Sequence, residues 1–409
     1  MDIINPQDNI PYESNALKQT HPLHLYQLAK AFDLKPTHPD NARVLELACA
    51  SGGNLIPMAF YYPQSKFVGI DISAQEIAFA KESVETLALD NIQFIAQSIT
   101  DYKDTQKFDY IICHGLYSWV DSTTRESVLK ICQQHLSEHG IAYISYNTYP
   151  GWVVGNTLRA LMLFASKDEI SLNAKLSQAH ELLKNLSTVH PQTSYDWLLH
   201  EEVKLVLAHS DNQLLHEHLS NMHFPLYFHE FIENAKRYDL HYLCDATFFE
   251  FEQSSFDLHY SQQQDLMNNR RFRSTLLCKQ AVQSALVDEM NKAYDQLASQ
   301  VNANPKVGDK PLASKLARYQ ITHQQHVTNV LHENILLTPI AQAIFPYLDG
   351  EHEIDILKKV VKQYIEEGAL VLVDNFHNPI TDKQEQEQKI NVLLQETLLL
   401  LASRYLVDI

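Results

Sequence analysis

Short apolar runs alternate with segments of helical period between residues 42 and 147. The runs that predict buried strands lie at 42–48, 66–72, 91–98, 108–115 and 141–147. The segments between them repeat apolar residues every three or four positions. Ser73 is the expected N-cap of one such helix, with Glu76 three residues later, and another helix is expected to end at Gly140. Strands and helices in this order predict an α/β fold, with a parallel sheet covered by helices on both faces.

The pattern changes after Trp152. Residues from about 155 to 290 are mostly helical by period, and the polar segment 299–311 contains Pro and Gly as a linker would. Helix-like runs and a short strand-like run at 369–374 follow it. We therefore expect a Rossmann-like domain at 1–155, a helical middle domain at 156–295 and a winged-helix-like domain at 310–409.

Charge and composition narrow the classes of partner. The chain carries 50 acidic and 32 basic residues, a net charge of −18, which argues against a nucleic-acid backbone as principal partner and favours basic protein surfaces. Five scattered cysteines indicate free thiols in a reducing compartment. The pairs His323/His326 and His216/His218 lack thiol or carboxylate companions at ligand spacing, so no metal is expected. No secretory segment opens the chain and no apolar run reaches membrane-spanning length, so a cytoplasmic protein is expected.

The stretch VLELACASGGN (44–54) carries the strongest chemical signal. A strand ends in Glu46, and the small residues after it allow a ligand to approach the backbone closely. Asp71 ends the next strand, where an acid can hold the two ribose hydroxyls of a nucleoside. Turn, helix, strand and terminal acid at this spacing together predict a nucleoside-cofactor site.

The identity of the cofactor follows from what the turn contains and lacks. It has no G-x-G-x-x-G, so a dinucleotide is disfavoured, and the carboxylate of Glu46 suits the cationic ligand S-adenosylmethionine. The turn resembles motif I of class I methyltransferases, E-x-G-C-G-x-G, with Ala48 and Ala50 in place of two glycines. Because alanine is tolerated where φ is negative, we expect less clearance there but no loss of binding.

Further cofactor contacts are expected at the other strand ends. Many class I enzymes place an Asp after the third strand, but here the chain reads Gln97, Ser98 and Ile99. His114, after the fourth strand, is either a core histidine or a cofactor contact. The expected cofactor-binding residues are Tyr12, Glu46, Ala48, Cys49, Ala50, Asn54, Asp71, Ile72, Ser98, Ile99 and His114.

A narrower resemblance extends over nearly the whole chain. The segments that carry it are YESNALKQTHP (12–22), ASGGNLIPMA (50–59), LYSWV (116–120), SYNTYPGW (145–152), FPLYFHEFI (224–232), RRFRSTLLC (270–278), PLASKLARYQ (311–320), HVTNVLHE (326–333) and YLDG (347–350). Together they resemble the bacterial class I methyltransferases with a methyltransferase regulatory domain, a family that includes protein-lysine methyltransferases of outer-membrane proteins. The resemblance implies a protein or peptide substrate, for example an outer-membrane protein before export, and leaves its identity open.

The aromatic stretch after the fifth strand has two interpretations. Methyl transfer to a lysine needs a neutral, desolvated amine, and an aromatic pocket both lowers the pKa of an amine and receives cations. Tyr117, Trp119, Tyr146 and Asn147 are therefore the expected substrate-pocket residues, without a unique general base. The alternative is a Pro-Gly turn whose aromatic residues, Tyr149 and Trp152 among them, seal the junction with the middle domain.

The leading hypothesis is a methyltransferase that uses S-adenosylmethionine and acts on protein lysine. One alternative is methylation of a small molecule or peptide. Another is a cofactor-binding scaffold without catalysis, which the two alanines and the missing acid after the third strand keep open. The sequence does not determine the oligomeric state.

Overall fold

The computed structural model describes residues 14–169, 171–247, 257–281, 307–324, 326–374 and 378–407. Tyr12, expected at the cofactor, lies outside the described residues, and so do residues 299–306 of the expected linker.

A seven-stranded sheet organises the first two thirds of the chain, in the order β3-β2-β1-β4-β5-β7-β6. Its strands are β1 (Arg43–Leu47), β2 (Lys66–Asp71), β3 (Ile92–Ala96), β4 (Phe108–Cys113), β5 (Leu136–Asn147), β6 (His241–Asp245) and β7 (Phe272–Cys278). The first five strands pair in parallel, whereas β7 runs antiparallel to both β5 and β6. The sheet is therefore mixed rather than wholly parallel, because its last two strands come from the chain beyond residue 240.

Helices cover both faces of this sheet, as the alternation predicts. One core joins α1, α2 and α3 to residues such as Val44 and Tyr110, and a second joins α4 and α9 to Leu45 and Ile111. Adjacent strand residues thus enter opposite cores, as strand geometry requires. These helices are α1 (Pro22–Lys30), α2 (Leu55–Tyr61), α3 (Ala74–Leu87), α4 (Ser122–His135) and α9 (Phe228–Lys236). Ser73 caps α3 as expected, with its side chain accepting the Glu76 N–H at 3.2 Å.

Several boundaries differ from the sequence-based expectation. α4 ends at His135 rather than Gly140, because Leu136 already pairs with Phe108 of β4 across a bulge. The segment expected to be mostly helical also contains β6 and β7. In the run 369–374 the structure has an isolated bridge from Val373 to Pro379 in place of the expected strand.

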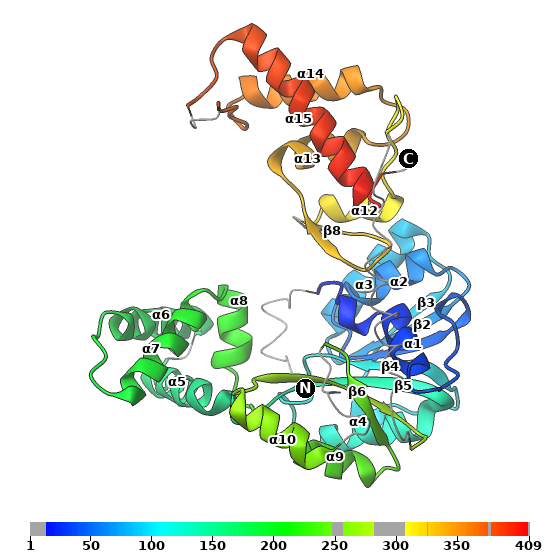
Figure 1. The fold of residues 1–409 in the computed structure, drawn as a ribbon, viewed down its shortest axis with the longest axis vertical. Helices are drawn as coiled ribbons and strands as arrows, with labels where there is room; N and C mark the ends of the chain where they lie inside the picture. The colour runs from blue at the N-terminus through cyan, green and yellow to red at the C-terminus, as the bar shows by residue number, and fades with distance from the viewer. Residues whose placement is uncertain are drawn as a thin grey trace.

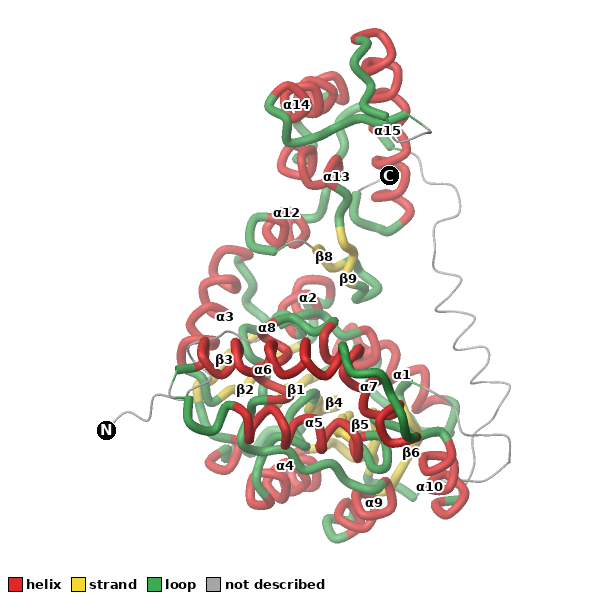
Figure 2. Tube along the Cα trace, turned by 90° about the vertical axis from the view of Figure 1, so that its left-hand side faces the viewer, coloured by secondary structure: helices red, strands yellow, loops and turns green. Residues whose placement is uncertain are grey.

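A helical excursion leaves the sheet after β5 and returns beside it. It contains α5 (Trp152–Ala165), α6 (Leu172–Ser187), α7 (Ser194–Leu207), α8 (Asp211–Gln213) and the π-helix η5 (Leu214–His218), with a core of its own. Its two ends are held together, since the Leu226 N–H donates to Asn147 O at 3.1 Å and the Tyr149 N–H donates to Leu226 O at 3.1 Å. In Figure 1 α5, α6 and α7 stand to one side of the sheet, opposite its edge strand β3, and in Figure 2 they lie in front of it.

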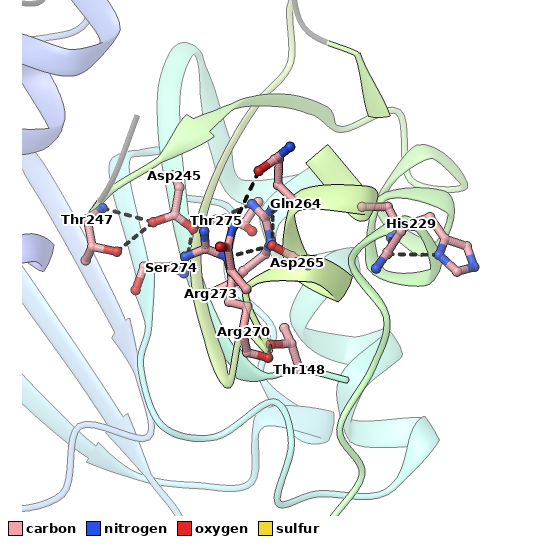
Figure 3. Close-up of polar contacts among 12 residues, drawn as sticks. Thr148, His229, Asp245, Thr247, Gln264, Asp265, Arg270, Arg273, Ser274 and Thr275 are labelled. Atoms are coloured by element: carbon pink, nitrogen blue, oxygen red, sulfur yellow. Dashed lines mark hydrogen bonds and ion pairs between the residues drawn. The ribbon is translucent and has the colours of Figure 1, made fainter. Parts of the chain in front are cut away.

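Buried ion pairs tie the returning chain to the sheet. Arg273 of β7 is fully buried and donates to Asp265 of α10 (Leu258–Met267) at 2.7 and 2.9 Å. Arg270 donates to the same carboxylate at 2.6 Å, so that Asp265 lies between the two guanidinium groups (Figure 3). Arg271 pairs with Glu202 of α7 at 2.5 Å. Arg271 therefore binds an acidic side chain of the helical excursion, whereas Arg270 and Arg273 pair with Asp265 of the returning segment itself.

The C-terminal part forms a separate core at one end of the molecule (Figure 1). Its elements are α12 (Lys315–Ile321), β8 (His326–Thr328), β9 (Asn334–Leu336), α13 (Pro339–Ile344), α14 (Ile354–Glu366) and α15 (Lys383–Ser403). It contacts the helices α2 and α3 of the seven-stranded sheet: Tyr61 donates to Thr328 O at 3.2 Å and Lys315 donates to Leu87 O at 3.0 Å.

Candidate active site

The turn after β1 has an unexpected backbone. Ala48 and Ala50 have φ values of +60° and +45°, in the left-handed region that favours glycine. The expectation that these alanines occupy negative φ is therefore wrong. The chain must reverse sharply here, because the Cys49 N–H is held by Ile70 O of β2 at 3.1 Å before α2 begins. The turn keeps the glycine-type backbone of the motif although alanines replace the first two of its three glycines.

Asp71 is fixed at the carboxyl end of β2 by backbone donors on both sides. Its Oδ2 accepts the Ala50 N–H at 2.9 Å, and its Oδ1 accepts the Ser73 N–H at 2.9 Å. These two bonds fix the orientation of the carboxylate beside the turn. The acid thus stands where the parallel strands β1 and β2 end, which is the ligand-binding edge of such a sheet.

A cavity of about 400 Å³ opens at this edge. Among the expected site residues, those that line it are Ala48, Ala50, Asp71, Ile72, Ser98, Ile99, His114 and Trp119. The structure thus brings together the ends of β1, β2, β3 and β4 around one space.

Glu46, Cys49 and Asn54 lie behind this wall. Asn54 donates to Glu46 Oε1 at 2.7 Å, whereas the buried Glu46 Oε2 has no hydrogen-bond partner among the described residues. Burial raises the pKa of Glu46 to about 8. The Cys49 thiol is also buried, which raises its pKa well above the usual value.

Asn54 is the meeting point of three distant segments. Its Oδ1 accepts the Leu17 N–H at 3.0 Å, a hydrogen bond from Thr20 at 3.1 Å, and one from His332 Nε2 at 2.8 Å. Thr20 therefore helps to hold the N-terminal segment against the turn. His332 belongs to the C-terminal part, which therefore contacts the turn after β1 through the buried side-chain amide of Asn54.

His114 contacts side chains of β5 and also lines the cavity. Its Nδ1 lies 3.0 Å from the Tyr143 hydroxyl and 3.1 Å from Ser145 Oγ, and the ring lines the cavity. Burial lowers the pKa of His114 to about 4, so its ring is neutral at neutral pH.

The aromatic residues expected to bind substrate divide into two groups. Trp119 lines the cavity, but Tyr117 and Tyr146 are buried in the second core against Phe231. The Tyr146 hydroxyl points to Thr275 of β7 at 2.9 Å. Asn147 lies near the junction, with its amide nitrogen 2.8 Å from His223 Nε2. The cavity lining therefore supports a pocket role for Trp119, and the role predicted for the other three stays a prediction.

Tyr149 and Trp152 pack at the junction with the helical excursion. Tyr149 accepts a hydrogen bond from Asn156 at 3.0 Å. The Trp152 ring lies 4.4 Å from His223 and beneath the Arg271 guanidinium. These contacts correspond to the seal that was the alternative interpretation.

One wall of the cavity was missed by sequence reasoning. It is formed by His216, Glu217, Ser220 and Met222. His216 was considered only as part of an H-x-H pair, and a π-helix over 214–218 leaves no periodic signal in the sequence. A second cavity of about 190 Å³ shares His114, His216 and Glu217 with the first.

The same π-helix gathers further ionisable groups. Ligand-type atoms of His209, Glu217 and His218 lie within 4.8 Å of one another. Burial, together with repulsion of the charged form by His209, Arg271 and Arg159, lowers the pKa of His218 to about 3. Two guanidinium groups oppose a divalent cation at this position, and we assign no metal there.

Comparison with known proteins agrees with this geometry. Three family profiles match the chain: "Methyltransferase domain" over residues 38–214, "Predicted methyltransferase regulatory domain" over 210–256, and "PKMT, C-terminal winged helix domain" over 309–406. The structure of PKMT2 from Rickettsia typhi in complex with AdoHcy superimposes with a TM-score of 0.83 at 27% identity, covering 97% of this chain and all of that one.

Two relatives from Rickettsia prowazekii (strain Madrid E), both described as uncharacterized proteins, are similar in sequence. RP028 is 38% identical over 233 residues, which are 56% of this chain and 93% of RP028. RP789 is 40% identical over 290 residues, which are 67% of this chain, and the chain spans about half (52%) of the length of RP789.

The fold and the site define a class I methyltransferase. The chain belongs to the bacterial class I methyltransferases that carry a methyltransferase regulatory domain, as the sequence resemblance predicts. The winged-helix assignment of the C-terminal part is likewise confirmed. Within the described residues, we find no helix with the length and apolar character needed to cross a membrane.

Proposed function

We propose that this protein transfers a methyl group from S-adenosylmethionine to a lysine side chain of a protein. The observation that carries the proposal is Asp71, held by two backbone N–H groups at the edge of a cavity that the ends of four parallel strands surround. The family and the AdoHcy-bound relative support the same cofactor.

The residues present fit this cofactor. The cavity volume of about 400 Å³ is in the range of small-molecule sites. Asp71 would receive the ribose hydroxyls, with Ser98 and Ile99 beside the adenine. Behind the turn, Glu46 Oε2 has no hydrogen-bond partner among the described residues and would accept a hydrogen bond from the ammonium of the methionine part, whose positive charge would favour the carboxylate form of Glu46. When bound, S-adenosylmethionine supplies an electrophilic methyl group.

The chain's own residues must hold an amine in line and keep water away. Leu116, Trp119, Val120 and Met222 give the cavity an apolar and aromatic side. Burial beside them disfavours the charged form of a lysine and so lowers its pKa toward the neutral, nucleophilic state.

A protein substrate is supported by the relative's class and by the charge of the chain. The winged-helix match is to a domain of PKMTs, or protein-lysine methyltransferases. The net charge of −18 attracts basic segments, in which lysines are frequent. An outer-membrane protein before its export is the finer proposal that the family suggests.

The test begins with calorimetric titration of S-adenosylmethionine and S-adenosylhomocysteine. We expect wild type to bind both, Asp71→Ala to lose binding, and the exposed Asp90→Ala to behave as wild type. Radiolabelled methyl transfer to candidate proteins then locates the label, which we expect on lysine. No binding by wild type would refute the cofactor assignment. Label only on small molecules or peptides, or binding without any transfer, would favour the alternatives of another acceptor or a non-catalytic scaffold.

A further inference from the structure

The wall opposite the cofactor edge comes from the helical excursion. Its π-helix, η5, spans Leu214–His218 and places His216 and Glu217 on the lining of both cavities. Single-turn π-helices occur frequently at functional sites, because they turn side chains out of the α-helical register. Glu217 therefore stands where the larger cavity meets a smaller one bounded by Asn15 and Leu17 of the N-terminal segment.

Three carboxylates line the larger cavity among the described residues: Asp71, Glu76 and Glu217. Asp71 is engaged by backbone N–H groups of the cofactor turn, and Glu76 lies in the first turn of α3 on the same side. Glu217 is the acid on the opposite wall, near the apolar residue Met222. A cation that enters from the side away from the cofactor meets this carboxylate.

The groups around Glu217 repel a monovalent cation less than a divalent one, because the repulsion by Arg159 and Arg271 scales with the charge of the cation. The π-helix packs against α5, α6 and α8, and the ionisable residues that face Glu217 from these elements and across the cavity are His114, Arg159, His209, His216, His218 and Arg271. His114 and His218 are neutral, since burial lowers their pKa values to about 4 and about 3. The charge of Arg271 is compensated by two bonds to Glu202, at 2.5 and 2.7 Å.

Burial also affects Glu217 itself. It raises the pKa of this carboxyl above the usual value, against a smaller opposite effect of His209 and Arg271. A carboxylate with a raised pKa is a better proton acceptor near neutral pH than an exposed glutamate.

We propose that Glu217 binds the ammonium of the incoming lysine and accepts its proton before methyl transfer. The inference rests on the proposed function and adds the catalytic base that the sequence left unassigned. The ammonium N–H bond breaks and its proton goes to a Glu217 oxygen. The amine lone pair then forms the N–C bond while the C–S electron pair stays on sulfur, and S-adenosylhomocysteine and a methylated ammonium result.

The first test needs no identified substrate. Sinefungin carries an amine where S-adenosylmethionine carries its methyl sulfonium, whereas S-adenosylhomocysteine carries neither charge. We expect wild type to bind sinefungin at least about tenfold more tightly than S-adenosylhomocysteine, as one charge-assisted hydrogen bond allows. Glu217→Gln should abolish this preference and leave S-adenosylhomocysteine binding unchanged. The control is Glu181→Gln, an exposed acid of α6, which should keep the preference.

The second test compares pH profiles of methyl transfer. Without Glu217 the rate should depend on the free lysine amine and rise about tenfold per pH unit toward a pKa of about 10.4. The deficit of Glu217→Gln should therefore be about 100-fold at pH 7 and shrink at higher pH. The wild-type rate should fall as pH drops through the raised pKa of Glu217, because the protonated acid cannot accept a proton.

The outcomes separate the two proposals. If wild type binds neither analogue, the proposed function fails. If both analogues bind and the preference survives in Glu217→Gln, or the deficit is equal at every pH, only the role of Glu217 is refuted. A stoichiometric metal ion in purified wild type that is lost in His218→Ala would also refute it, by giving the carboxylate a different cation.

Discussion

Replacing Ala48 and Ala50 by glycine should stabilise the protein. Both alanines occupy left-handed backbone, at φ +60° and +45°. That conformation costs an L-residue roughly 1–2 kcal/mol, whereas glycine adopts it freely and loses roughly 0.5–1 kcal/mol more conformational entropy on folding. The difference leaves a gain of about 0.5–1 kcal/mol per site.

The assay is thermal unfolding of Ala48→Gly, Ala50→Gly and the double variant, monitored by near-ultraviolet circular dichroism. A gain of about 1–2 kcal/mol for both sites corresponds to a rise in melting temperature of about 2–8 °C for a domain of this size. S-adenosylhomocysteine affinity should not fall, because the Ala50 N–H that Asp71 accepts is a backbone group.

Two alanines of α3 and its cap provide controls. Ala88 follows α3 with φ +57°, far from the cavity lining, so Ala88→Gly should also stabilise and leave ligand binding unchanged. Ala78 is exposed within α3, so Ala78→Gly should destabilise by about 1 kcal/mol. If the cavity-lining glycines lower the melting temperature while Ala88→Gly raises it, the turn is not strained and the reasoning is refuted.

Three further changes have an expected direction of effect on stability or on hydrogen exchange. Asp265→Ala leaves Arg273 buried without its carboxylate and should cost about 3–5 kcal/mol, measured by denaturant unfolding beside the exposed control Glu201→Ala, which should show no change. The folded-state pKa of Glu46, about 8, lies above its ordinary value of 4.5, so the folded protein holds a proton that the unfolded chain releases. The free energy of unfolding should therefore decline as pH rises from 5 to 8. Glu46→Gln should flatten that decline when melting temperature is measured against pH. His332→Ala removes a buried donor to Asn54 and should increase hydrogen exchange in the winged-helix part, and unchanged exchange would show that this contact does not hold that part in place.

The sequence was sufficient for the elements whose signal is local. Strand alternation, the Ser73 cap and the acid at Asp71 each depend on a few neighbouring residues, and all appear as predicted. The antiparallel strand β7 was missed because its place in the sheet depends on Asp265 and Arg273, which are far from β5 in the sequence. Burial of both its faces also removes the alternation that identifies a strand.

The site was predictable on the cofactor side and less so on the acceptor side. Ala48 and Ala50 were placed in the right turn with the wrong backbone, since φ is set by how the chain reverses rather than by residue type. Tyr117 follows β4 and Tyr146 lies near the end of β5, at the edge of the sheet where the site is, but their rings turn into the second core. Glu217 could not be found from spacing, because a π-helix brings it to the cavity.

The hydrogen bonds that join the two ends of the helical excursion bear on how members of this family come to accept different substrates. Hydrogen bonds among Asn147, Tyr149 and Leu226 join the point where the chain leaves the sheet to the point where it returns, so the helical excursion is closed at its base. Such a segment tolerates insertion, deletion or replacement at little entropic cost to the rest of the fold. Exchange of the helical excursion between relatives should therefore transfer the preference for a methyl acceptor and leave S-adenosylmethionine binding unchanged. Such exchanges would redirect methylation to other acceptors.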